Sequence, residues 1–184
     1  MKGCYMSNFL EGEKVYLRQL EPCDSDYFRW FNNPIICQGN SHCVYPMTQS
    51  QVLGYIDSLD ARKDVLALAI IDKKVGNHIG NISLQNIHPV YRSAELAIIL
   101  DNIAWAKGFA TEAVKLIIAH GFNALNLHRI SCATFRHNQG MRSLAIKAGF
   151  RIEGICKQAA WKDGNWVDVV EYGLLDKEST IVLK

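Results

Sequence analysis

The order of apolar and polar residues along the chain predicts alternating strands and helices. Residues 15–20 alternate as in a half-buried strand, and residues 22–31 begin with the proline and aspartate typical of a short helix. Residues 35–46 follow neither pattern and are expected to form a loop. Residues 48–60 begin with a capping-box pattern, Thr-x-x-Gln, and continue with apolar residues at helical spacing, so they are expected to form a second helix.

The middle of the chain predicts a sheet. Apolar runs separated by turn-forming residues predict an antiparallel meander of three strands: residues 65–71, 79–87 and 94–100. A segment with a long apolar face predicts a helix from Gly108 to about Ala124, and residues 130–135 predict the next strand. The strands on either side of this helix should be parallel.

The last part of the chain predicts one more helix and a hairpin. Residues 141–148 have a helical pattern, and Gly149 is suited to end that helix. Turn-forming residues at 162–165 separate two final strands. We see no internal repeat and no linker, so residues 1–184 are expected to form a single domain.

Composition and charge restrict the class of protein. Lys and Arg total 20 against 18 Asp and Glu, and this net charge of +2 gives no reason to expect nucleic acid as a partner. No apolar stretch reaches the roughly 18 to 20 residues that span a bilayer, so no membrane is expected either. The 6 cysteines form no Cys-x-x-Cys pair and the N-terminus has no signal-like segment, which indicates reduced thiols in the cytoplasm. The 6 histidines show no compact ligand pattern, so no metal is expected.

Residues 104–113, Ala-Trp-Ala-Lys-Gly-Phe-Ala-Thr-Glu-Ala, lie where an apolar run gives way to a helix. Gly108 and Ala110 allow a ligand to approach the backbone closely, and the first N–H groups of the helix have no intrahelical partner. A phosphate would satisfy these N–H groups and the positive end of the helix dipole. An ordinary strand-to-helix turn is the alternative for this segment taken alone.

The same segment resembles the acetyl-CoA pyrophosphate loop of the GNAT superfamily of N-acetyltransferases, whose general form is Gln or Arg, two residues, Gly, one residue, Gly or Ala. Gly108 and Ala110 match the fourth and sixth positions of this form, while Trp105 stands where Gln or Arg is usual. The form with tryptophan is similar to the RimJ/RimL branch, which includes protein N-terminal acetyltransferases. The resemblance extends over about residues 15–175.

This resemblance implies the α+β GNAT fold, with a mixed, mostly antiparallel central sheet flanked by about four helices. In that fold the strands at 94–100 and 130–135 splay apart around the pantetheine arm of acetyl-CoA. Exposed N–H and C=O groups on a splayed strand suit an amide-rich arm, which can pair with them as another strand would. The resemblance also implies the residues that bind the cosubstrate: Ile99, Leu100, Trp105, Ala106, Lys107, Gly108, Phe109, Ala110, Thr111 and Asn138.

A second match to the family lies at residues 138–150, which resemble Asn-x-x-Ser, a helix, and Lys-x-Gly-Phe. By this resemblance Asn138 hydrogen-bonds the cosubstrate; capping the helix is its alternative role, and the two are compatible. Ala145 falls where many GNAT enzymes place the tyrosine that protonates the departing thiolate. We therefore assign no general acid.

Glu95 is the candidate catalytic base, because only a neutral amine has the lone pair needed to attack a thioester. An alkyl amine with a pKa of ~10.4 costs ~4.6 kcal/mol to deprotonate at pH 7, and an α-amine near ~7.7 to 8.0 costs only ~1 to 1.4 kcal/mol. Glu95 is the only carboxylate in the strand at 94–100, and it matches a glutamate that acts as base in several GNAT enzymes. Its alternative role is an ion pair with Arg92 or another basic neighbour.

The early helices and the final hairpin are expected to form the acceptor side, opposite the entry of CoA. They carry aromatic residues that suit an acceptor pocket, with packing in the core as the alternative: Trp30, Phe31, Tyr45, Trp161 and Trp166. Two acidic pairs, Asp24/Asp26 and Asp60/Asp64, could attract an amine, although such pairs are more often solvated.

The sequence therefore predicts an N-acetyltransferase that moves an acetyl group from acetyl-CoA to a primary amine by direct attack in a ternary complex. A protein N-terminus, a polyamine, an amino sugar and an aminoglycoside all remain open as acceptors. The alternative from another class is a CoA-binding GNAT domain without turnover. We expect a monomer or a homodimer.

Overall fold

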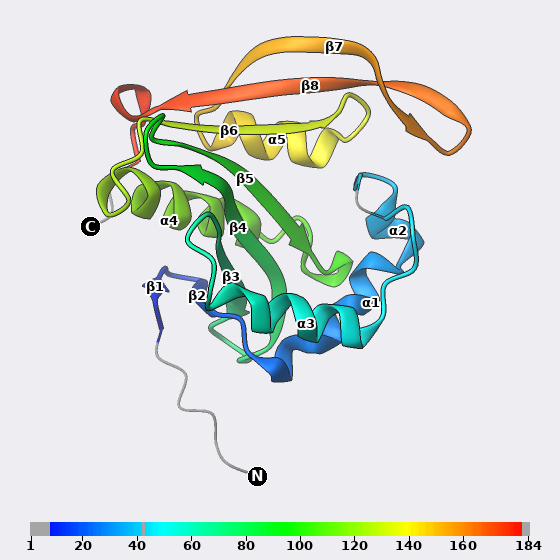
Figure 1. The fold of residues 1–184 in the computed structure, drawn as a ribbon, viewed down its shortest axis with the longest axis vertical. Coiled ribbons are helices and arrows are strands. Elements are labelled where there is room, and N and C mark those ends of the chain that lie inside the picture. The colour runs from blue at the N-terminus through cyan, green and yellow to red at the C-terminus, as the bar shows by residue number, and fades with distance from the viewer. Residues whose placement is uncertain (1–7, 42, 182–184) are drawn as a thin grey trace.

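The computed structural model describes residues 8–41 and 43–181 and contains one sheet of eight strands, in the order β1-β2-β3-β4-β5-β6-β8-β7 (Figure 1). The strands are β1 (Leu10–Glu11), β2 (Val15–Gln19), β3 (Leu66–Asp72), β4 (His78–His88), β5 (Ser93–Leu100), β6 (Arg129–Phe135), β7 (Arg151–Lys162) and β8 (Asn165–Leu175). All neighbouring strands are antiparallel except β5 and β6, which are joined by the crossover helix α4.

The helices of the described chain are short apart from α3 and α4. The α-helices are α1 (Phe28–Phe31), α2 (Pro34–Cys37), α3 (Gln49–Leu59), α4 (Phe109–Asn123) and α5 (Gln139–Lys147). Three 3-10 helices complete the list: η1 (Pro22–Tyr27), η2 (Asn102–Ala104) and η3 (Asp176–Glu178). The predicted α+β GNAT fold is confirmed, and each strand expected from the apolar pattern is present.

Two helix starts show how local sequence sets the fold. At α3, the Thr48 side chain accepts a hydrogen bond from the Gln51 N–H, and the Gln51 side chain accepts one from the Thr48 N–H, as the capping-box pattern predicts. The expectation of a continuous loop at residues 35–46 was wrong, because α2 lies in this segment. Asn33 caps α2 through the Ile35 N–H, and Pro34 occupies its first turn, where a missing N–H costs nothing.

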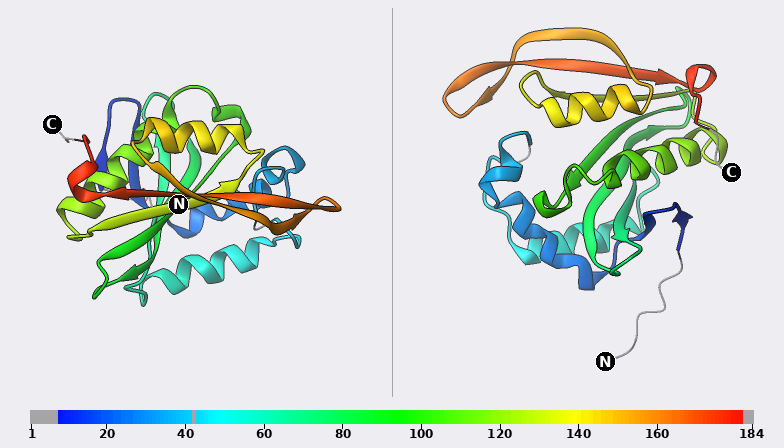
Figure 2. Two further views of the ribbon diagram at one scale, coloured as in Figure 1. Left: turned by 90° about the horizontal axis from the view of Figure 1, so that it is seen from above. Right: turned by 180° about the vertical axis from the view of Figure 1, so that it is seen from behind.

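Different helices cover the two faces of the sheet (Figure 2). On one face, α4 and α5 bury the larger apolar core, which includes Ile70, Leu84 and Ile117. On the other face, η1, α1 and α3 bury a second core that includes Ala69 and Ile71 of β3. Because successive strand residues point to opposite faces, β3 contributes to both cores and is apolar almost throughout.

A buried ion-pair cluster joins β2, η1 and β4. Arg18 donates to both carboxylate oxygens of Asp24, at 2.6 and 2.7 Å, and the two residues are only 5% and 4% exposed. The Glu21 N–H donates to the same carboxylate at 2.9 Å, and His78 Nδ1 lies 3.4 Å from it. Asp24 is thus buried in an ion pair and is not the solvated residue that the sequence had suggested as one alternative for the Asp24/Asp26 pair.

The neighbours of this cluster shift its pKa values. Burial alone would raise the pKa of Asp24, but the hydrogen bonds from Arg18 and Glu21 outweigh it and hold the pKa below its usual range. Burial lowers the pKa of His78, so its ring is neutral at pH 7. Both groups bind protons more weakly in the folded chain than in the unfolded chain, so both lose stabilising free energy as the pH falls.

We expect Asp24→Asn to lower the free energy of unfolding at pH 7 by about 3–5 kcal/mol, because it leaves the Arg18 guanidinium buried without its carboxylate. Urea unfolding measures this change, and Asp64→Asn, which removes an exposed pair with Arg62, is the control and should change little.

The difference in free energy of unfolding between wild type and Asp24→Asn should stay constant at pH values above the unfolded pKa of Asp24, near 3.8. It should shrink as the pH falls below that value. If Asp24→Asn and Asp64→Asn lowered the free energy of unfolding equally, the buried pair would not stabilise the fold.

Candidate functional site

The candidate site begins where β5 and β6 separate. The two strands are paired only at Ser93–Glu95 with Arg129–Ser131. Beyond this point β5 remains paired with β4 to Leu100, and β6 remains paired with β8 to Phe135 (Figure 1). The edges that β5 and β6 turn toward one another therefore lack a ladder of backbone hydrogen bonds, which is the splay that the sequence predicted.

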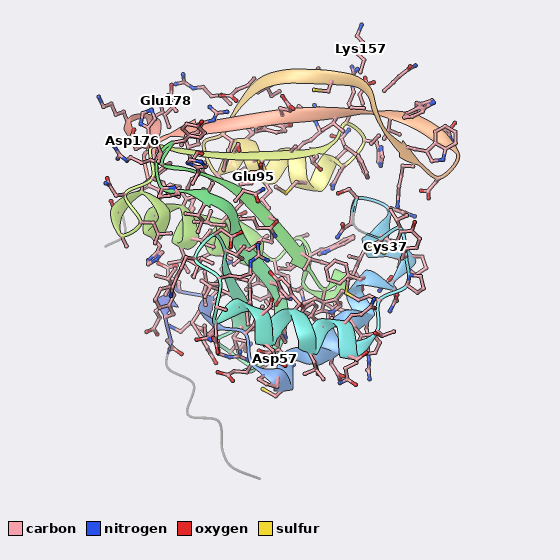
Figure 3. The ribbon with its side chains drawn as sticks, in the orientation of Figure 1. Cys37, Asp57, Glu95, Lys157, Asp176 and Glu178 are labelled. Carbon is pink, nitrogen blue, oxygen red and sulfur yellow. A yellow bond between two sulfur atoms is a disulfide. The ribbon has the colours of Figure 1, made fainter. Side chains whose placement is uncertain are left out.

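Glu95 occupies the last paired position of β5, directly before the strands part (Figure 3). Its side chain is exposed, and it lies beside Gln85 of β4 and Ser131 of β6 in the sheet register. The alternative role, an ion pair with Arg92, is not formed: the Arg92 guanidinium donates instead to the carbonyl and the side chain of Asn126, both at 2.7 Å. The carboxylate of Glu95 therefore stays available at the vertex of the splay.

At the other end of β5, the backbone is shaped to leave the N-terminus of α4 open. Gly108 is the N-cap residue with a φ of 87°, and Ala106 has a φ of 59°. This left-handed conformation favours glycine, and no side chain caps the helix. Phe109 and Ala110 turn their side chains toward the larger core, so the first N–H groups of α4 are left for a ligand. The geometry fits a phosphate-bearing ligand.

Trp105 fastens this loop to the strand before it. Its indole Nε1 donates to the Leu100 carbonyl at 3.1 Å, while 45% of the side chain remains exposed. The Leu100 carbonyl, predicted to contact the cosubstrate, is thus already a hydrogen-bond acceptor within the chain. This contact gives a physical role to the tryptophan that replaces the usual Gln or Arg.

Lys14 is a residue of this site that the sequence did not reveal. Its Nζ donates to the Lys107 carbonyl at 3.3 Å, 93 residues away in the chain, and the position of a Cβ on Gly108 would lie 3.2 Å from the same amine. The Glu112 carboxylate accepts the Lys14 backbone N–H at 2.9 Å and so fixes the turn before β2 against α4. Lys14 therefore adds a cation beside the open helix N-terminus.

Asn138 has the structural role that was its alternative. Its Oδ1 accepts the Met141 N–H at 3.0 Å as the N-cap of α5, and its Nδ2 donates to the Gly39 carbonyl at 3.0 Å. A Cβ on Gly39 would lie 2.6 Å from that Nδ2, so glycine permits the close approach. His137 Nε2 also lies 3.2 Å from the Gln38 carbonyl, so the loop after α2 rests on the start of α5. A contact between Asn138 and the cosubstrate stays a prediction.

A disulfide between Cys37 and Cys43 closes this loop, contrary to the expectation of reduced thiols throughout. The two residues are only 6 apart, and the turn that follows α2 brings their Cα atoms to 5.5 Å, a distance that suits a disulfide. No motif marks this spacing, so the disulfide could not be predicted from the sequence. The composition therefore no longer argues for a reducing compartment.

Ala145, where many family members carry a tyrosine, is 1% exposed and packs in the larger core beside Ala148. The position has no hydroxyl and no access to solvent. The structure thus agrees with the absence of a general acid at this point of α5.

The aromatic residues of the acceptor side fall into two groups. Trp30 is 8% exposed, packs in the second core, and donates from Nε1 to Asp101 at 3.1 Å. It also lines a cavity of about 360 Å³ together with Asp24 and Asp26, so its part in an acceptor pocket stays a prediction. Phe31 packs against the same core. Tyr45 is 82% exposed, and Trp161 and Trp166 form an edge-to-face pair at the tip of the β7–β8 hairpin, with centroids 5.2 Å apart. Only this second group faces solvent.

In the part of the chain that the structure describes, no group of three or more His, Cys, Asp or Glu side chains could hold a metal ion. None of its helices is long and apolar enough to cross a membrane.

Comparisons with known proteins match this geometry. The family model of the acetyltransferase (GNAT) domain matches residues 14–151. An uncharacterized N-acetyltransferase of Bacillus subtilis, YoaA, is 25% identical over 173 residues, which cover 92% of this chain and 98% of that protein.

Two solved structures with CoA share the fold. The spermidine N-acetyltransferase of Vibrio cholerae in complex with CoA and spermine superimposes with a TM-score of 0.82 at 24% identity, over 91% of this chain and 98% of that one. The ribosomal L7/L12 α-N-protein acetyltransferase RimL in complex with CoA gives a TM-score of 0.83 at 18% identity, over 92% and 98%. At this identity the two structures support the fold but do not identify the acceptor. The splayed strands, the open N-terminus of α4 and the family match together show that the chain belongs to the GNAT family and is an acetyl-CoA-dependent N-acetyltransferase.

Proposed function

We propose that this enzyme acetylates a primary amine that is presented at the vertex of β5 and β6, and that a protein N-terminal α-amine is the first candidate. The observation that carries the proposal is the position of Glu95, an exposed carboxylate without an ion pair among the described residues, at the last residue pair before the strands part. The open N-terminus of α4 lies at the opposite end of the same strand.

Two parts of the chain would hold acetyl-CoA, which supplies an acetyl group already activated as a thioester. The N–H groups of Phe109, Ala110 and Thr111 would bind its pyrophosphate, with the amines of Lys14 and Lys107 balancing the charge. The free edge of β5, including Ile99, would pair with the amides of the pantetheine arm. A backbone N–H of this edge is also suited to stabilise negative charge that develops on the thioester oxygen.

Glu95 would remove a proton from the ammonium form of the acceptor. The amine then attacks the thioester carbonyl carbon directly, and no side chain of the enzyme becomes acetylated. With Ala145 in place of a tyrosine, the CoA sulfur leaves as a thiolate or takes its proton from water. In this proposal, Glu95 is therefore the one side chain to which we assign a proton transfer.

The charges near the site favour an acceptor with a single amine. A polyamine carries several positive charges and needs several unpaired carboxylates, but Asp168 of the hairpin is paired with Arg136, and Asp26 with Arg29. Glu95, by contrast, has no ion pair among the described residues. A protein α-amine also needs only ~1 to 1.4 kcal/mol for deprotonation at pH 7, which is within reach of one exposed glutamate.

A polyamine is the second candidate, because a spermidine acetyltransferase shares the fold as closely as RimL does. Acetyl-CoA-dependent release of thiol, measured over a panel of peptides, spermidine, amino sugars and aminoglycosides, distinguishes these acceptors. Turnover of spermidine but of no peptide would overturn the first candidate. Binding of acetyl-CoA without turnover of any amine would support a non-catalytic CoA-binding domain.

We expect acetyl-CoA to raise the unfolding temperature, and Gly108→Glu to abolish this shift, because the variant puts bulk and negative charge at the proposed pyrophosphate site. Gly76→Glu is the matched control: Gly76 also has a positive φ, of 74°, and no atom lies within 4 Å of its Cβ position. The control should keep the shift despite similar backbone strain.

In the same assay, Lys14→Met should reduce the affinity for acetyl-CoA by about tenfold, since it removes one charge-assisted contact without changing the backbone. An unchanged shift in folded Gly108→Glu would show that the pyrophosphate binds elsewhere.

We expect Glu95→Gln to bind acetyl-CoA normally but to lower kcat/KM by about 10²-fold or more at pH 7, because the variant cannot accept a proton. Part of the loss should be recovered as the pH rises toward the pKa of the amine. Steady-state kinetics across pH measure this, with Glu11→Gln, an exposed strand glutamate at the far end of the sheet, as control. A variant that follows the wild-type pH profile would mean that Glu95 is not the base.

We expect Trp166→Ala to raise the KM for the acceptor several-fold while leaving acetyl-CoA affinity nearly unchanged, because Trp166 is 60% exposed at the hairpin tip on the acceptor side. Phe9→Ala, at an aromatic residue 48% exposed beside the opposite edge of the sheet, is the control. Weaker acetyl-CoA binding with unaltered acceptor kinetics would show that the hairpin tip lies on the cosubstrate side and that the proposed placement of the two substrates is wrong.

A further inference from the structure

A cavity of about 300 Å³ lies between α5 and the strands β7 and β8. Five of its lining residues come from α5, at helical spacing on one face of that helix, and the other two are Ile152 and Tyr172. None of the residues predicted to bind acetyl-CoA lines it. A volume of this size is at the lower end of the range for small-molecule sites.

Two polar atoms of the residues that line this cavity are buried without a hydrogen-bond partner among the described residues, namely Arg142 Nε and the Tyr172 hydroxyl. Tyr172 is only 1% exposed. The Arg142 guanidinium is held by its NH1, which donates to the Arg136 carbonyl at 3.1 Å, so Nε is left as a fixed donor. Buried polar groups are normally paired, and an unpaired one costs free energy that a ligand can recover.

The polar groups around the cavity are suited to an anion. Arg142 and Lys147 bring two positive charges, Ser143 adds a hydroxyl, and no carboxylate lines the cavity. The acidic residues nearest in sequence to Ile152 and Tyr172 are Glu153 and Glu171. Glu171 precedes Tyr172 in β8 and so points to the other face of the sheet. Glu153 lies over Gly173, whose Cβ position is also on that other face. Glu153 is paired there with Arg129. The positive charge of the cavity is therefore not neutralised from within.

Apolar surface lies beside these donors. Ile146 of α5 and Ile152 of β7 line the same cavity and are 54% and 51% exposed. We propose that this cavity is a binding site for a small organic anion, with a carboxylate or phosphate head on Arg142 and Tyr172 and a short aliphatic body against the two isoleucines. The site is separate from that of acetyl-CoA, and the proposal does not depend on which amine the enzyme acetylates.

Titrations followed by NMR at the Arg142 Nε–H resonance test this site with three probes: acetate, 3-methylbutanoate and inorganic phosphate. Saturable shifts are expected, with 3-methylbutanoate tighter than acetate by several-fold, since each buried CH₂ contributes roughly fourfold. Tighter binding of phosphate than of either carboxylate would identify the head group as a phosphate. No saturable shift with any probe would overturn the proposal.

The same titrations in saturating acetyl-CoA test whether the cavity is a separate site. We expect the affinities to remain unchanged. Loss of anion binding under these conditions would assign the cavity to the cosubstrate and overturn the proposal.

Tyr172→Phe is the most informative variant, because it removes a hydroxyl that has no hydrogen-bond partner among the described residues. We expect it to leave the midpoint of urea unfolding unchanged or higher and to weaken anion binding by about tenfold. Arg142→Gln should abolish saturable binding, followed by calorimetry, while Lys157→Gln, which removes an exposed charge from β7 outside the cavity, should not. A destabilised Tyr172→Phe variant with wild-type anion affinity would show that the hydroxyl is satisfied within the protein.

Discussion

The separation of β5 from β6 after three residue pairs is the constraint on which the rest of this structure depends. On its other side β5 is paired with β4 apart from one register shift, and β6 is paired with β8 along its whole length, so the sheet is continuous through its remaining neighbours. The crossover helix α4 begins beyond the open end of β5 and leads back to the start of β6 at the paired end. As a result, unpaired backbone groups of a strand edge and of a helix N-terminus border the same opening, where an extended ligand can satisfy both.

The backbone features of the candidate site, the separated strands and the uncapped start of α4, could be predicted from the sequence and the family resemblance. The apolar pattern determines where β5 ends and α4 begins, and Gly108 is needed at the junction because its φ is positive. These are local signals, carried by residues close together in the chain. Glu95 could be found for the same reason, since it is the only carboxylate in an otherwise apolar strand.

The features that the sequence did not predict depend on partners far apart in the chain or on a turn without a motif. Lys14 reaches the Lys107 carbonyl only because the turn before β2 lies against the start of α4, and a lysine in a turn has no signature of that contact. Trp30 donates its indole N–H to Asp101, 71 residues away, a contact that its neighbours in the sequence do not reveal. Asp24 resembles a solvated acid, but Arg18 and His78 enclose it. Charge and aromaticity can be read from a sequence, whereas pairing and burial are consequences of packing.

The short helix α5 contacts three parts of the structure: the loop after α2, the larger core and the cavity beside β7 and β8. Its first residue is capped by Asn138, whose amide also holds the loop after α2. Ala145 and Ala148 are small enough for the helix to pack closely over the sheet, and Tyr172 belongs to the same core. The Tyr172 hydroxyl and the Nε of Arg142 are both buried without a hydrogen-bond partner among the described residues, and both residues line the cavity. Ala145 stands where many family members have a tyrosine, so this face of α5 has no acid. On another face of the helix, Tyr172 of β8 contributes an unpaired donor to the cavity.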